Sequence, residues 1–175
     1  MGAVALVVMI PKPWLAGYSG QTTDELIALD DVYRTDSIVL AIAQAVGARA
    51  NRIGTNALTD AERVVLAVEA LEREVNSGGY DSLFRYASDH VPLLVASLRA
   101  IGCDAVAALT EAAIALLEID GPLTPESVRS AIESDDDERG DRLSDYDTAY
   151  NQVAGDLADP LFGYIKAHRG EISLT

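Results

Sequence analysis

The segment from Thr59 to Tyr80 limits the fold of this chain most strongly, because it combines a helix start, a long amphipathic pattern and a helix stop. Thr59 and Glu62 form a capping-box pair, in which each side chain accepts a hydrogen bond from a free backbone N–H. Gly78 and Gly79 should end the helix, because glycine adopts left-handed backbone without steric penalty. Between these signals, apolar side chains recur with the period of one helix face: Ala61, Val64, Val65, Val68, Leu71 and Val75.

The rest of the chain also predicts helices rather than strands. Capping residues, prolines and glycines give their expected ranges as 23–29, 37–46, 60–77, 92–101, 105–119, 125–134, 145–158 and 160–169. Gly47 should end the second of these and Asp104 should cap the fifth, with a polar loop over 48–57 and a charged break over 135–142. We therefore expect an all-α, single-domain helical bundle of about seven to nine helices.

The first 21 residues read as an irregular arm in front of a helical domain that spans 22–175. The apolar run Ala3–Ile10 has no basic residues before it and is far shorter than the ~20 residues that cross a membrane, so we interpret it as a packed strand or arm. Trp14 and Tyr18 should pack onto the helical body. Cys103 is the only cysteine, which excludes an intrachain disulfide and is typical of a cytoplasmic protein.

The chain is strongly acidic, with a formal net charge of −15 over 175 residues. Residues 1–100 carry 8 basic and 12 acidic side chains, whereas residues 101–175 carry 5 basic and 16 acidic ones. Direct binding to nucleic acid or to an anionic membrane surface is not expected, because both need clustered Lys and Arg. Such a charge favours a basic protein partner, or serves solubility alone.

No residue pattern indicates catalysis, a metal or a cofactor. Two histidines and one cysteine cannot supply a usual zinc site. His168 lies in a predicted last helical turn, where positive charge offsets the helix dipole, and His90 lies near a helix start. The segment Asn76–Gly79 lacks the lysine and preceding strand of a phosphate-binding loop. We therefore predict a protein that is not an enzyme, with no catalytic residue, metal or cofactor.

The acidic residues near the C-terminal end of the chain are the candidate partner-binding site. Four of them recur every four residues, and on a continuous helix this spacing places carboxylates in a row with steps of about 6 Å. Such a row could imitate the closely spaced phosphates of a DNA strand. A solvated acidic loop is the alternative, because like charges at this spacing repel and Gly140 weakens a helix. The candidate residues are Glu133, Asp135, Asp136, Asp137, Glu138, Asp141, Asp145 and Asp147.

A calcium site in the same tract is a further alternative. Calcium takes oxygen ligands, but the order of acidic residues here does not match the Asp-x-Asp-x-Asp-Gly pattern and closing Glu of an EF-hand loop. We therefore predict no metal there.

The block around the double glycine resembles a known family. Glu74, Val75, Asn76, Gly78 and Gly79, followed by an aromatic segment and a helix ending in Ile101–Gly102, resemble a helical domain family that was long catalogued without a function. That family includes the nineteen-kilodalton acidic DNA-mimic proteins. Ser77 and Tyr80 depart mildly from its usual residues, and Tyr86 stands where the family usually has Asn. The clearest match covers 58–119.

The matching motif residues, Glu74, Asn76, Gly78, Gly79 and Tyr80, are expected to be structural. Asn76 has two interpretations: a hydrogen bond to the backbone where the chain reverses, or a contact between its amide and a ligand.

The resemblance implies a non-enzymatic acidic module that binds the basic face of a DNA-binding protein in place of DNA. Two alternatives stay open. An immunity-type partner of a basic toxin would also need an acidic surface. An enzyme with an unrecognised carboxylate site would need a cleft with buried carboxylates of raised pKa. A homodimer is left open as well.

Overall fold

All regular structure in the described part of the chain is helical. The computed structural model describes residues 11–134 and 136–175, so Ala3–Ile10 and Asp135 lie outside the described residues. Within them are no strands but eight α-helices and three short 3-10 helices, which confirms the predicted all-α fold. The α-helices are α1 (Thr23–Ile27), α2 (Thr35–Ile53), α3 (Asp60–Tyr86), α4 (Val91–Ala100), α5 (Asp104–Ala115), α6 (Pro125–Glu133), α7 (Asp137–Val153) and α8 (Ala158–Ala167); the 3-10 helices are η1 (Thr55–Ala57), η2 (Ser88–His90) and η3 (Arg169–Glu171).

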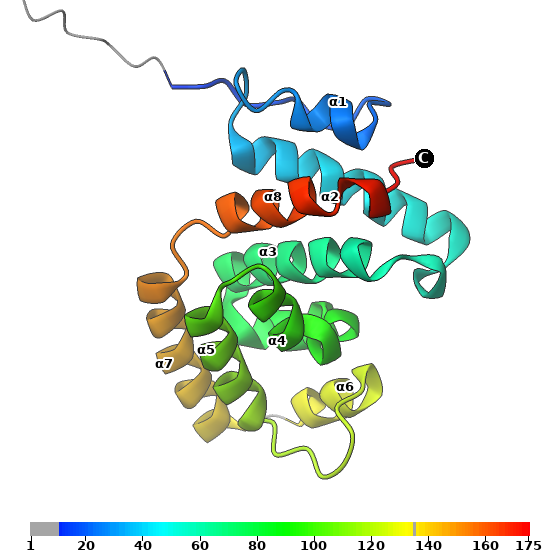
Figure 1. The fold of residues 1–175 in the computed structure, drawn as a ribbon. Helices are drawn as coiled ribbons and strands as arrows, with labels where there is room; N and C mark the ends of the chain where they lie inside the picture. Colours follow the sequence, from blue (N-terminus) through cyan, green and yellow to red (C-terminus); the bar gives the residue numbers. More distant parts are fainter. Residues whose placement is uncertain (1–10, 135) are drawn as a thin grey trace, which may run out of the picture.

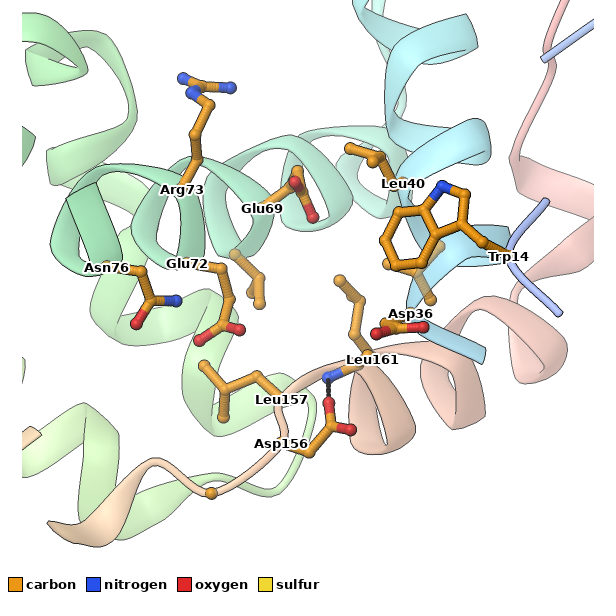
Figure 2. A pocket seen from close by; sticks show the side chains of 14 residues that line it. Trp14, Asp36, Leu40, Glu69, Glu72, Arg73, Asn76, Asp156, Leu157 and Leu161 are labelled. Carbon is orange, nitrogen blue, oxygen red and sulfur yellow. Dashed lines mark hydrogen bonds between the residues drawn. The ribbon is translucent and has the colours of Figure 1, made fainter. Parts of the chain in front are cut away.

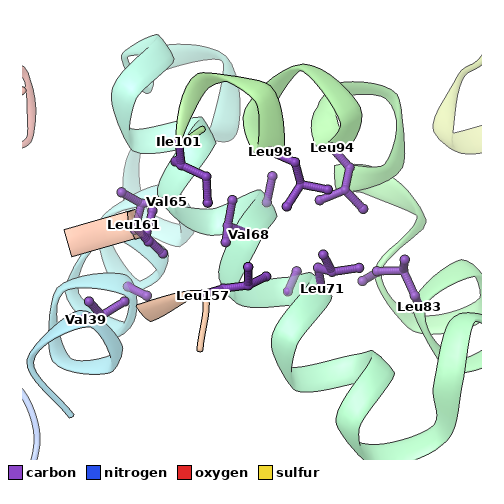
Figure 3. Close-up of a cluster of buried hydrophobic side chains, with 14 of the residues drawn as sticks. Val39, Val65, Val68, Leu71, Leu83, Leu94, Leu98, Ile101, Leu157 and Leu161 are labelled. Atoms are coloured by element: carbon purple, nitrogen blue, oxygen red, sulfur yellow. The ribbon is translucent and has the colours of Figure 1, made fainter. Parts of the chain in front are cut away.

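Helix α3 runs through the middle of the molecule and contacts most of the other helices. Helices α1, α2 and α8 lie on one side of it, and α4, α5 and α7 lie on the other (Figure 1). The predicted stripe faces both groups: Val65, Val68 and Leu71 are fully buried. Figure 3 shows Leu94 and Leu98 of α4 on one side of α3, with Leu157 and Leu161 on the other. Burying such a side chain contributes about 1.5–3 kcal/mol, so α3 anchors a single core.

The double glycine divides α3 into two straight parts. Gly78 has φ −159° and ψ 20°, and Gly79 has φ 73° and ψ −170°, so neither residue is helical. The prediction that one of them has positive φ is confirmed at Gly79. The helix that begins at Asp60 thus ends at the double glycine, as predicted, and a second helix follows across the kink, so that Asp60–Tyr86 forms one kinked element.

Several predicted bounds are wrong, because packing extends helices past weak residues. Gly47 does not end α2, which continues to Ile53 and ends at Gly54 with φ 86°. The predicted loop 48–57 is therefore mostly helical. Ala45, Val46 and Ala50 are all buried, and their burial outweighs the ~1 kcal/mol that glycine costs in a helix.

The charged break predicted over 135–142 is also wrong, because α7 begins within it, at Asp137. The Asp136 side chain accepts a hydrogen bond from the Arg139 N–H at 3.0 Å and caps the helix. Acidic residues in a first turn are favourable there, since they oppose the helix dipole. At the other end, α7 stops at Val153.

Helix α5 differs from its prediction at both ends. Asp104 is its first residue and makes no cap, and the helix ends at Ala115 rather than at Ile119. The residues that follow Ala115 still continue the core, because Leu116 and Leu117 are buried in a turn. In contrast, the predicted Thr124–Pro125 start of α6 is confirmed, with a capping box between Thr124 and Ser127.

The C-terminal tail is bound to the body through a buried carboxylate. Glu62 is fully buried, and its carboxylate accepts hydrogen bonds from Arg49 at 2.8 and 2.9 Å and from the Thr59 N–H at 2.9 Å. The Ser173 N–H donates a further bond to it at 2.9 Å. The residue predicted only as half of a capping box thus joins α2, the start of α3 and the tail.

Candidate functional site

The exposed side of α7 carries a row of carboxylates. Asp137, Asp141 and Asp145 follow one another at four-residue steps, Glu138 lies beside them, and all four residues are exposed. Helical rise separates successive members by about 6 Å. We call Asp137, Glu138, Asp141 and Asp145 the α7 acidic face. The alternative of an acidic loop is wrong for these residues.

Asp147 lies on the other side of the same helix. Residues two apart in a helix are turned by about 200°, so Asp147 and Asp145 point in nearly opposite directions. The Asp147 carboxylate accepts a hydrogen bond from the Tyr80 N–H at 2.8 Å, just past the double glycine. Burial raises the pKa of Asp147, while this hydrogen bond lowers it. Asp147 therefore caps the second part of α3 and, together with the buried Leu143 and Tyr150, sets which side of α7 faces outward.

The remaining predicted partner contacts are not part of one continuous helix. Glu133 is the last residue of α6, and Asp136 is the cap of α7. Helix α6 ends at Glu133, because Ser134 has extended backbone with φ −74° and ψ 119°, so the row does not extend from α7 through Glu133. Asp136, Asp137 and Asp141 instead share a surface hollow with Asp81 and Arg85 of α3. Sequence reasoning missed Asp81, because nothing in the spacing shows that α3 and α7 meet there.

The family motif has structural constraints at four of its five positions, including Gly78, where an added Cβ would lie 2.9 Å from the Ser82 Cβ. Glu74 accepts a hydrogen bond from the Ser82 hydroxyl at 2.9 Å, across the Gly78–Gly79 kink. A Cβ on Gly79 would lie 2.2 Å from an Asp147 carboxylate oxygen, so this position admits only glycine without rearrangement. Tyr80 is buried, and its hydroxyl lies 2.9 Å from the Thr110 hydroxyl.

Asn76 is the exception. It is exposed at the edge of a groove, and its side chain makes no hydrogen bond within the part of the chain that the structure describes. The backbone-capping interpretation of Asn76 therefore has no support from the described contacts.

That groove, of about 610 Å³, is the second candidate site. We call it the Trp14 groove. It lies between α2, the middle of α3 and the start of α8 (Figure 2). Its wall is apolar, with Leu40, Leu157 and Leu161. Trp14 from the N-terminal arm lines one end, and 53% of its surface is exposed, so this residue packs less closely than predicted.

Two glutamates of α3 face the Trp14 groove. Glu69 and Glu72 are three residues apart and hence on one side of the helix. Burial, and then the Glu72 carboxylate, raises the pKa of Glu69 to about 7, although Arg73 lowers it. Burial also raises the pKa of Glu72, whose carboxylate accepts a hydrogen bond from the Tyr150 hydroxyl. In the sequence, Glu69 and Glu72 could be recognised only as two acidic residues beside an apolar stripe. The fold is needed to show that both are half-buried in a groove.

Neither a metal-binding cluster nor a membrane-spanning helix is found among residues 11–134 and 136–175. These residues contain no cluster of three or more His, Cys, Asp and Glu side chains arranged to hold a metal ion. Their helices also include none with the length and apolar character needed to cross a membrane.

Comparison with known proteins tests the resemblance seen in the sequence. The model of the DMP19-like protein family matches residues 56–168, well over half of the chain. This range contains the α3 kink, all of α7 and the two glutamates of the Trp14 groove, but not Trp14 itself. Comparisons with curated proteins and with solved structures find no match. The family model alone thus supports the assignment: the chain belongs to the DMP19-like protein family.

Proposed function

We propose that this protein is a non-enzymatic acidic module that binds a basic protein, and that its α7 acidic face occupies the partner's DNA-binding surface. The observation that carries the proposal is a helix with carboxylates at regular steps along its outward side. Phosphates of a DNA strand form a comparable line of negative charge. The family resemblance to DNA-mimic proteins supports the same function.

The position of the charge supports binding through α7. Residues 101–175 hold 16 acidic and 5 basic side chains, and the hollow beside α7 is lined by Asp81, Asp136, Asp137 and Asp141 together with Arg85, which pairs with Asp81, and Arg139. A concentrated acidic surface speeds encounter with a basic partner and disfavours other acidic surfaces. The protein itself should not bind DNA, because both carry negative charge.

The test is capture of partners from a lysate by the immobilised protein at low and high salt, followed by mass spectrometry. A DNA-binding protein should be captured, and its capture should weaken steeply with salt, because exposed charges are screened within about 10 Å at 0.1 M. Duplex DNA should compete for the same partner. A ternary complex of partner, DNA and this protein would contradict the proposal.

Matched variants show which surface binds. The α7-face variant replaces Asp137, Asp141 and Asp145 by Asn and Glu138 by Gln. A control variant removes equal charge from the α1–α2–α8 side, at Asp24, Asp31, Asp60 and Asp159, which are also exposed. We expect the α7-face variant to associate with the partner at least ten-fold more slowly and the control variant to change this rate little, because nearby charges steer encounter.

The two alternatives make different predictions. An immunity-type protein would be captured with a basic toxin, and the toxin's activity would fall on binding. An enzyme is favoured by one observation, the half-buried Glu69, whose pKa of about 7 suits proton transfer at neutral pH. The described lining of the Trp14 groove contains no Ser, Thr, Cys, His or Lys beside it that could act as a nucleophile. We therefore place binding ahead of catalysis.

A further inference from the structure

The Trp14 groove combines an apolar wall with an excess of negative charge. Asp36, Glu69, Glu72 and Asp156 line it together with one described cation, Arg73. Arg73 extends away from the hollow in Figure 2 and pairs with Glu74 at 3.0 Å. The groove therefore has carboxylates that its own cation does not cover.

The carboxylates of the groove differ in whether they already have a hydrogen bond or an ion pair. Asp36 is paired with Arg34, and Asp156 accepts a hydrogen bond from the Ala158 N–H at 2.9 Å. Glu72 accepts the Tyr150 hydroxyl. Glu69 makes no hydrogen bond or ion pair within the described residues, although it is half-buried next to Glu72. A cation entering the groove would relieve the repulsion between Glu69 and Glu72.

The aromatic end of the groove also suits a cation with an apolar stem. The Arg34 guanidinium already lies 5.5 Å from the centre of the Trp14 ring. Much of the indole is still exposed, and it is directed toward the groove in Figure 2. A tryptophan face attracts a guanidinium most strongly among aromatic side chains.

We propose that the Trp14 groove binds an arginine side chain of the basic protein partner, with its guanidinium between Glu69 and Glu72 and its stem against Trp14, Leu157 and Leu161. Arginine fits better than lysine, because its planar guanidinium can donate hydrogen bonds to two carboxylates at once. The identity of the donor as a protein rests on the proposed function. The groove adds a specific contact to the non-specific attraction of the α7 acidic face.

The binding should depend on pH in a defined direction. Glu69 is faced by Glu72 and Arg73 on α3, by Asp36 on α2 and by Asp156 before α8, while Tyr150 of α7 contacts Glu72. The pKa of Glu69 is raised to about 7, so this carboxylate changes charge near pH 7, and burial raises the pKa of its neighbour Glu72 as well. Arginine binding should therefore tighten several-fold between pH 6 and pH 8 and should release a proton below pH 7.

The test uses the full chain and an uncharged-end peptide, acetyl-Gly-Leu-Arg-Leu-Gly-amide, in an NMR titration at low salt. The Trp14 indole N–H signal and the backbone signals of Glu69 and Glu72 should shift. Peptides with lysine or citrulline in place of arginine are the matched controls. We expect the lysine peptide to bind at least three-fold more weakly and the citrulline peptide at least ten-fold more weakly. Equal binding of arginine and citrulline peptides would overturn the proposal.

Two variants and a small cation complete the test. Glu69→Gln keeps the size of the side chain and should remove the pH dependence and weaken peptide binding about ten-fold, and Trp14→Ala should weaken it too. Circular dichroism checks that both variants are folded. If butylguanidinium, which carries the same single charge without a peptide, binds as tightly as the arginine peptide, the groove is a site for a free small cation and the assignment to a protein partner is wrong.

The α7-face variant separates this proposal from the proposed function. It should bind the arginine peptide as the unaltered protein does, since its changes lie outside the groove. Unshifted groove signals, with partner capture intact, would overturn the groove proposal alone. Peptide binding without capture of any basic protein would instead overturn the function proposed for α7.

Discussion

Gly79 is the position where backbone conformation and packing both exclude a side chain. Its φ of 73° is unfavourable for other residues, and the Asp147 carboxylate occupies the space that a Cβ would need. The Asp147 carboxylate can reach the Tyr80 N–H only because this space is empty. One glycine thus permits both the turn of α3 and its attachment to α7.

Gly79→Ala should lower the free energy of unfolding by about 2–4 kcal/mol, from left-handed strain together with displacement of Asp147. Urea denaturation followed by circular dichroism measures this. Gly140→Ala is the control, because Gly140 lies in α7 with open space around it. That change should stabilise the protein by up to about 1 kcal/mol.

The double variant Gly79→Ala/Asp147→Ala identifies the obstacle. Shortening Asp147 removes the overlap, so the double variant should lose about 1 kcal/mol less than the sum of the two single variants. Additive losses would mean that the cost at Gly79 is conformational strain alone.

Glu69 should make stability depend on pH. Its pKa is about 7 in the folded protein, above its ordinary value of 4.5, so the folded state binds more protons between these pH values. The contribution of Glu69 to the free energy of unfolding is therefore at its full value below pH 4.5 and is lost as the pH rises through 7. Glu69→Gln should therefore stabilise the protein at pH 8, by about 1–2 kcal/mol after allowing for partial solvent screening, and change it little at pH 4.5. Thermal melts at both pH values measure this, with Asp145→Asn as a control that should change little at either.

At the scale of the elements, local signals predicted helix starts better than helix ends. Thr59 and Thr124 begin helices as predicted, because each cap depends on residues within one turn of the same helix. Gly47 gave a wrong end for α2, because the continuation of that helix depends on the burial of Ala50 against other helices. The acidic tract gave a wrong start for α7, because the Asp136 cap and the favourable position of acidic residues in a first turn outweigh the repulsion between them.

Removing the charges of the α7 acidic face should leave the helix intact. These residues are exposed, while Leu143 and Tyr150 hold the helix to the body. The α7-face variant loses favourable charge at the helix start but also loses repulsion between successive carboxylates, effects of about 0.3–1 kcal/mol each and of opposite sign. Its melting temperature should stay within about 3 °C of the unaltered protein. A large loss of helical signal would show that the row has contacts inside the fold.

At the scale of the whole molecule, the tail joins parts of the chain that are far apart in sequence. Ile172 and Leu174 are buried, and the Thr23 hydroxyl donates to the Ile172 carbonyl at 2.8 Å. The Trp14 groove is likewise formed by segments that are far apart in the sequence, because the N-terminal arm, α2, α3 and the start of α8 meet in it. Neither assembly could be predicted from periodicity, which describes each helix separately. The resemblance to the family predicted the helical fold but did not predict these contacts.

Leu174→Ala tests the tail. Truncating a buried leucine costs about 2–5 kcal/mol, depending on how far the site collapses, and we expect the lower half of this range for a segment near the surface. Thr175→Ala is the control, since Thr175 is exposed and its change should cost less than about 0.5 kcal/mol. Equal melting temperatures for both variants would show that the tail does not stabilise the fold.

The attachment of α7 through Asp147 has a consequence for how such proteins can diverge. The contact that orients the helix uses only its inward side, so the outward positions 137, 138, 141 and 145 can be substituted without turning it. Charge, size and aromatic character on that side are therefore free to change while the scaffold is kept. Members of one family can share the kink, the core and the angle of this helix and still recognise unrelated partners. Under the proposed function, in which α7 meets the partner, the outward residues of α7 identify the partner of an individual member better than the motif that identifies the family.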